Sequence, residues 1–143
     1  FTVLINEHRV IKHGNTNIIL AGVTDYSAHI LLESHKSSPE NALKGSPSSY
    51  TKILLAHQPK SIYAASKAGF DLQLSGHTHG GQYIPFKYFA KLIHPVVKGL
   101  HKINNTWIYV SKGTGYWGPP IRLGSPSEIT LIKLKRSIPL KTN

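Results

Sequence analysis

The strand, helix, strand pattern in the middle of the chain most constrains its fold. Residues 51–56 form a continuous apolar run, residues 59–68 place small apolar side chains on one face of a helix, and residues 71–74 form a second short apolar run. Two strands joined by a crossover helix favour a parallel pair in an open sheet. The sequence therefore predicts an α/β fold with a mixed sheet.

Short strands are also predicted before and after this unit, because apolar and β-branched residues alternate there between turn signals. They cover residues 2–5, 9–12, 17–24, 106–110 and 128–135. Residues 25–50 predict a surface connection with one short helix that begins at residues 38–40, where Ser can cap and Pro suits the first turn. The stretch that follows residues 71–74 and runs to about residue 100 is predicted to be a loop.

Length and composition bound the class of protein. A chain of 143 residues fits one domain. The absence of Cys excludes a disulfide scaffold, a Cys-ligated zinc site and thiol catalysis. No apolar run reaches the ~20 residues of a membrane helix. The chain starts inside an apolar run without Met, so we expect residues 1–143 to be a single partial domain of a longer protein, with residues 137–143 as a frayed tail.

The charge balance points to anionic partners. The chain has 17 Lys and Arg against 6 Asp and Glu, a net charge of +11. Such an excess favours phosphate-bearing ligands, nucleic acid or an anionic membrane surface. The lysines are scattered, however, and only residues 133–136 form a small basic cluster without interleaved aromatic residues. This placement argues against nucleic acid.

Histidines carry the candidate chemistry, because nine are present and the acidic residues are few and dispersed. His57 follows the first strand of the central unit, and His77 and His79 follow the second, within the sequence GHTHGGQ at residues 76–82. Carboxyl ends of parallel strands are where open α/β sheets hold ligands. Three imidazoles around one point match a catalytic zinc site, or part of a larger metal site.

Two sequence blocks resemble a known family. LLAHQP at residues 54–59 followed by GHTHGGQ at residues 76–82 resembles the last two blocks of the calcineurin-like metallophosphoesterases. Residues 113–129 are similar to the C-terminal block of a bacterial branch that includes membrane-associated and twin-arginine-exported members. The resemblance identifies the chain as the C-terminal half of such a domain.

The resemblance implies a fold, a metal site and a reaction. The fold would be the C-terminal portion of a four-layer α/β/β/α sandwich. Two divalent metal ions, Mn, Fe or Zn, would be bound, one by His57 and His77 and the other by His79. The remaining ligands of the family come from three blocks N-terminal to the matched part, so the isolated chain is expected to be inactive. The complete protein would hydrolyse phosphomonoester, phosphodiester or pyrophosphate bonds, at or beyond a bacterial membrane.

Four further residues are candidates for substrate binding. Arg122 has a guanidinium that suits phosphate, Tyr116 and Trp117 lie in a Gly/Pro-rich loop, and Gln82 directly follows the histidines. With the basic charge, the Tyr-Trp loop suits a lipid-linked phosphate. The expected partners are this substrate, the N-terminal half of the same protein, and a second copy of the chain paired through exposed sheet surface.

Two other functions fit the residues by themselves. One is a basic module that binds anions or nucleic acid without catalysis, in which His77 and His79 are structural. The other is a self-contained three-histidine zinc hydrolase. Sensitivity to chelators separates the first of these from the metal-dependent enzymes.

Overall fold

The central unit of the sheet is parallel, as the sequence predicts. In the computed structural model, which describes residues 1–135, β3 (Thr51–Leu55) and β4 (Leu72–Ser75) lie side by side in parallel. They are joined by η3 (Pro59–Ser61) and α2 (Ile62–Ala68). α2 ends at Gly69, whose left-handed φ of 88° turns the chain back toward β4.

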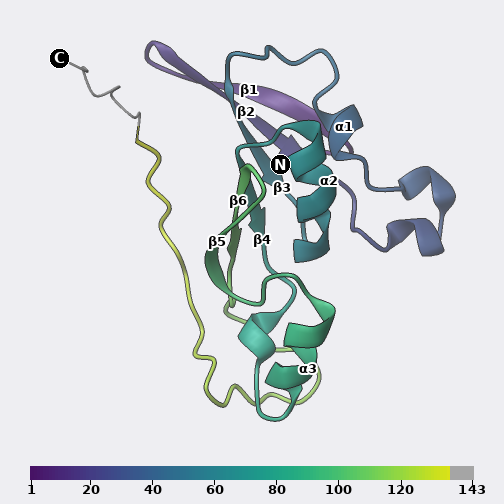
Figure 1. Cartoon of the computed structure of the whole chain (residues 1–143), viewed down its shortest axis with the longest axis vertical. Coiled ribbons are helices and arrows are strands. Elements are labelled where there is room, and N and C mark those ends of the chain that lie inside the picture. Colours follow the sequence, from purple (N-terminus) through teal and green to yellow (C-terminus); the bar gives the residue numbers. More distant parts are fainter. Residues whose placement is uncertain (136–143) are drawn as a thin grey trace.

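Four more strands complete a mixed, six-stranded sheet in the order β1-β2-β3-β4-β6-β5 (Figure 1). The inner neighbours β2 (Thr16–Gly22), β3, β4 and β6 (Thr106–Val110) are parallel. The edge strands β1 (Glu7–His13) and β5 (Gly99–Ile103) are antiparallel to β2 and β6. This α/β architecture is consistent with a C-terminal portion of a metallophosphoesterase domain.

The two faces of the sheet differ in cover. One register row joins Ala21, Leu54, Gln73 and Ile108 across four strands, and all four are fully buried beneath α1 (Pro39–Ala42) and α2. The adjacent row joins Leu20, Ile53, Leu72 and Trp107 and points to the opposite face. Trp107 is 45% exposed, so among residues 1–135 this second apolar face is only partly covered.

The connections include both confirmed and unforeseen elements. Ser38 caps α1 as predicted, since its hydroxyl accepts a hydrogen bond from the Asn41 N–H. The stretch predicted as a loop instead holds η4 (His79–Gly81), α3 (Phe86–Ile93) and β5. Two short 3-10 turns, η1 (Ala28–Ile30) and η2 (Glu33–His35), lie within the surface connection.

The strand predicted at residues 2–5 is wrong. Asn6 has a φ of 53°, which interrupts the extended backbone before β1, and its side chain binds residues 36 and 38 of the surface connection. Leu4 instead packs directly on Gly22, where an added Cβ would lie 2.6 Å from the Leu4 Cβ. Residues 2–5 therefore pack on the end of β2 without joining the sheet.

The strand predicted at residues 128–135 is also wrong. This segment is not part of any ladder in the described chain, although Glu128 donates its backbone N–H to the Gly113 carbonyl. Ile129 and Leu131 are almost fully exposed. Alternating apolar residues favour an extended chain, but a strand also needs a neighbour with free backbone groups. The tail predicted at residues 137–143 lies outside the described residues.

Helices long and apolar enough to cross a membrane do not occur within residues 1–135.

Glu128 fixes the start of the extended segment through charge. Its Oε1 accepts a 2.7 Å hydrogen bond from the Tyr109 hydroxyl, and its Oε2 lies 3.0 Å from Lys112 Nζ. These contacts, the Tyr109 bond foremost, lower the pKa of the Glu128 carboxyl from 4.5 to about 2. Because the folded pKa is depressed, the stabilisation is complete above about pH 4.5 and is lost as the pH falls toward 2.

Glu128→Gln is therefore expected to lower the free energy of unfolding by about 1–3 kcal/mol at neutral pH. Below pH 4.5 the difference from the wild type should shrink, since the Glu128 carboxylate of the unfolded chain then takes up a proton that the folded chain does not bind until about pH 2. Urea unfolding at a series of pH values measures this. A difference that is constant over the whole range would contradict the assigned role of the carboxylate charge.

Candidate metal centre

The loops after β3 and β4 bring two histidines to one edge of the sheet. His57 follows β3 and His77 follows β4, and the Gly76 N–H donates to the His57 carbonyl at 3.1 Å. The Ser75 hydroxyl donates to the Ala56 carbonyl at 2.7 Å. Backbone and side-chain bonds thus hold the two loops together before any ligand binds.

His57 and His77 meet through their ring nitrogens. His77 Nδ1 lies 3.0 Å from His57 Nε2, and the rings are edge to face with centroids 4.8 Å apart. Burial lowers the pKa of His77, and the neighbouring His57 and His94 lower it further. At neutral pH the His77 ring is accordingly held in its neutral form, which is the form that binds metals.

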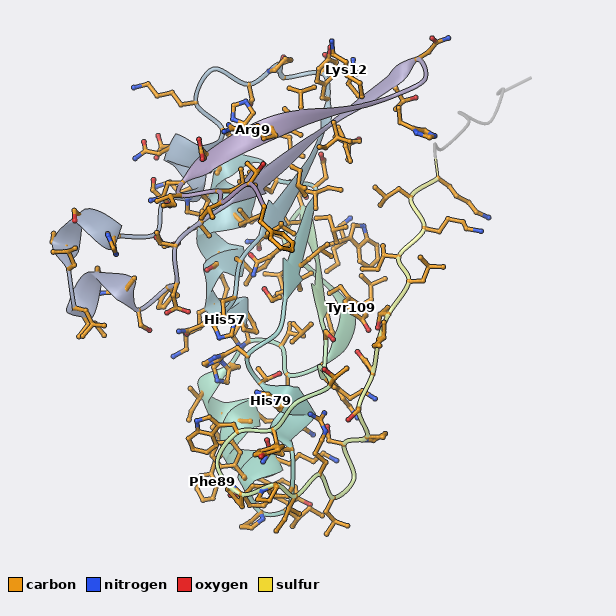
Figure 2. All side chains as sticks on the ribbon, turned by 180° about the vertical axis from the view of Figure 1, so that it is seen from behind. Arg9, Lys12, His57, His79, Phe89 and Tyr109 are labelled. Carbon is orange, nitrogen blue, oxygen red and sulfur yellow. The ribbon has the colours of Figure 1, made fainter. Side chains whose placement is uncertain are left out.

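His79 lies apart from this pair on η4. Its Nδ1 is buried and has no hydrogen-bond partner among the described residues, while its backbone carbonyl accepts a 2.7 Å bond from the Ser125 hydroxyl. In Figure 2 the label of His57 stands near the middle of the molecule's length, and that of His79 stands further toward α3. Within residues 1–135 no group of three His, Asp or Glu side chains is arranged to hold a metal ion. The chain by itself therefore gives no support to a self-contained three-histidine zinc site.

The backbone around these histidines is strongly left-handed. His77 and His79 have φ values of 70° and 50°, and Gly80, Gly81 and Gln82 continue the positive φ. Positive φ is uncommon for residues other than glycine and often marks a functional loop. A Cβ on Gly80 would lie 2.5 Å from Ser125 Oγ, and one on Gly81 would lie 2.7 Å from Lys87 Cα. The two glycines therefore permit close packing as well as an unusual backbone.

Two residues near the pair have no signal in the local sequence. His94 ends α3, and its ring centroid lies 5.2 Å from that of His77. Burial lowers the pKa of His94, with nearby Lys60 as the second cause. Asp25 lies beyond the carboxyl end of β2, where it accepts hydrogen bonds from the Gln58 side chain and the Ser27 N–H. The sheet order could have revealed Asp25, since β2 adjoins β3, but the position of His94 depends on a helix that the pattern did not predict.

The Gln82 side chain holds the loop that carries Trp117. Gln82 is 2% exposed, its Oε1 accepts from the Trp117 N–H, and its Nε2 donates to the Trp117 and Pro119 carbonyls. The Trp117 ring is exposed and stacks on Phe86 with centroids 5.4 Å apart. Tyr116 is exposed beside it in sequence. The amide of Gln82 is thus occupied by backbone, whereas both aromatic rings face outward.

Arg122 is likewise occupied by backbone groups. Its guanidinium donates to the carbonyls of Lys112, Gly115, Ser125 and Pro126. These four carbonyls come from both sides of the Gly/Pro-rich loop. In this arrangement Arg122 organises the loop and has little capacity left for a phosphate.

Comparison with known proteins connects this geometry to a family. No family model matches the chain. A Helicobacter pylori protein described as an uncharacterized metallophosphoesterase is 44% identical over 135 residues, which cover 93% of this chain and 35% of that protein. A Bos taurus protein, "Transmembrane protein with metallophosphoesterase domain", is 45% identical over 122 residues, 82% of this chain and 28% of its own length. The chain belongs to the metallophosphoesterases.

The relatives also show how much of a metallophosphoesterase this chain covers, and they correct one expectation. The chain spans 28–35% of the length of these two relatives, consistent with one part of a larger domain. An Aquifex aeolicus metallophosphoesterase is 35% identical over 123 residues and is covered to 47%. Because bovine and bacterial relatives match equally well, the restriction to a bacterial branch is not supported.

Proposed function

We propose that the whole protein containing this chain is a dinuclear metal-dependent phosphoesterase, to which the chain contributes His57, His77 and His79. The observation that carries the proposal is the meeting of His57 Nε2 and His77 Nδ1, 3.0 Å apart, at the ends of adjacent parallel strands. The family supports hydrolysis of phosphate esters, and its name implies metal ions.

The residues present fit part of such a metal centre. His57 and His77 would hold one cation, since His57 Nε2 and His77 Nδ1 lie 3.0 Å apart and burial lowers the pKa of His77, which favours the neutral ring. His79 would hold the other, since its buried Nδ1 has no partner within the described chain. Two divalent cations supply charge neutralisation for the phosphate and an activated water.

Anionic ligands must come from elsewhere in the whole protein. The negative charge of Asp25 acts to raise the pKa of His77. One of the Asp25 carboxylate oxygens, however, already accepts hydrogen bonds from Gln58 and Ser27. Neutral imidazoles cannot offset the charge of two divalent cations. We therefore assign the remaining ligands to a part of the domain outside this chain, which would also pack on the open face around Trp107.

Metal removal tests the proposal. The whole protein, after chelation, is expected to lose hydrolysis of an aryl phosphate and to regain it with Mn²⁺, Fe²⁺ or Zn²⁺. Bound metal is measured on the same samples by elemental analysis. The chain of residues 1–143 alone is expected to be inactive under all these conditions. Full activity of a metal-free sample would overturn the metal assignment, and full activity of the isolated chain would overturn the need for outside ligands.

For the substrate, we take the class to be a phosphate ester with an apolar portion, including lipid-linked phosphates. The exposed rings of Tyr116 and Trp117 support this class of substrate. Their loop is hydrogen-bonded to Gln82, the residue that ends the GHTHGGQ segment. Trp117→Ala is expected to lower kcat/KM for a lipid-linked phosphate by about tenfold, from the loss of apolar burial. Hydrolysis of a small aryl phosphate should change much less. Equal losses on both substrates would contradict the apolar contact.

A further inference from the structure

We propose that α3 forms a bilayer-docking surface, through which the protein binds anionic lipid membranes. The helix presents an apolar side to solvent instead of to the core. Leu92 is 84% exposed, Tyr88 is 59% exposed and Phe89 is 56% exposed, while Ala90 on the opposite side is buried. A surface helix ordinarily turns its apolar stripe inward. Here the stripe has no cover among residues 1–135.

The exposed side chains form one continuous surface. Residues 88, 89, 92 and 93 lie on one side of the helix by their spacing. The surface extends to the neighbouring loop, because the Phe86 ring stacks on both Tyr83 and Trp117. We define the α3 patch as the exposed apolar residues of this region: Ile84, Tyr88, Phe89, Leu92, Ile93 and Trp117. Contiguous apolar surface of this kind marks an interaction site.

Charge around the α3 patch favours an anionic bilayer over other partners. Lys87 and Lys91 are spaced four residues apart and border one edge of the apolar stripe. No Asp or Glu occurs between Asp71 and Glu128, whereas six Lys and Arg do. Basic residues beside an apolar stripe, with aromatic rings at its margin, are the composition of helices that lie in the headgroup region. Aliphatic side chains such as Leu92 have no role in binding a phosphate backbone.

The α3 patch lies at the same end of the molecule as the histidines. α3 packs on η4 through the contact of Gly81 with Lys87, and His94 at the end of α3 faces His77. Figure 2 labels Phe89 beyond His79 at this end. A bilayer on the patch would therefore bring lipid headgroups toward the candidate metal centre. Only this last consequence rests on the proposed phosphoesterase function.

Vesicle binding of the whole protein tests the proposal. We expect co-sedimentation with vesicles of phosphatidylcholine and phosphatidylglycerol, and much weaker binding to phosphatidylcholine alone. Leu92→Asp should weaken binding by at least about tenfold, since it removes apolar burial and adds a repelled charge. The matched control is Leu31→Asp directly after η1, which replaces a residue that is 92% exposed but lies outside the patch. Its binding should equal that of the wild type.

Three results would overturn the proposal: no binding by the wild type, equal weakening by both variants, or a dimer that Leu92→Asp dissociates. The last would show that a second copy covers the α3 patch. Hydrolysis of a soluble aryl phosphate is measured in parallel and should be equal in the wild type and Leu92→Asp. A protein that binds vesicles but hydrolyses nothing would contradict the proposed function alone, and the converse would contradict the bilayer contact alone.

Discussion

Replacing His77 with alanine is expected to lower the rate of aryl phosphate hydrolysis by the whole protein roughly a thousandfold. The expectation follows from the loss of one of two imidazoles that meet 3.0 Å apart. A bound cation supplies several kcal/mol of transition-state stabilisation, and each 1.36 kcal/mol corresponds to about tenfold in rate. Metal content, measured on the purified variant, should fall together with the rate.

His101→Ala is the matched control for this variant. His101 is exposed on β5, where its ring contacts the Lys98 carbonyl, so its removal also deletes one imidazole from the surface. Rate and metal content should remain those of the wild type. A His77→Ala protein that keeps both its metal and its rate would show that His77 is structural and is not a metal ligand.

Gly81→Ala is expected to produce the second large effect, through packing instead of ligation. The added Cβ would lie 2.7 Å from the Lys87 Cα, which is backbone and cannot rotate away. The φ of 79° adds strain for any residue with a Cβ. Together these effects should cost about 2–5 kcal/mol and separate η4 from α3. Thermal unfolding measures the loss of stability, and the hydrolysis rate should fall at least about tenfold as His79 moves.

Gly69→Ala separates strain from steric overlap. Gly69 has a similar φ of 88° at the end of α2, but an added Cβ there would meet no atom within 4 Å. Only the conformational cost of about 1–2 kcal/mol should appear, with the hydrolysis rate unchanged. Equal losses of stability in the two variants would show that Gly81 is required for its backbone conformation alone.

The sequence predicted the parts of the fold whose signals are local. Apolar runs of strand length around a short helix predicted β3, α2 and β4, and the same pattern placed His57 and His77 at neighbouring strand ends. These predictions succeed because both strands lie in the middle of the sheet, where buried residues such as Ile53 and Leu54 make the apolar run continuous.

Three features could not be read from the sequence, each for a physical reason. α3 was missed although its apolar residues recur at helical spacing, because the helix has only eight residues and follows Pro85 with no side-chain cap to mark its start. The role of Arg122 depends on four carbonyls brought together by a loop, and carbonyls carry no sequence signal. Residues 128–135 alternate like a strand, but pairing depends on a neighbour that local pattern does not specify.

Hydrogen bonds join the loop of residues 76–82 to the Gly/Pro-rich segment, so the folded unit extends beyond the end of the sheet. Within residues 1–135 the last strand finishes at Val110, yet Ser125 supports the carbonyl of His79 and Trp117 is bound by Gln82. A chain shortened at the end of the sheet would keep every strand and still lose the supports of its metal loop. The boundary that matters for design is therefore near Glu128, well beyond the last regular element of the described residues.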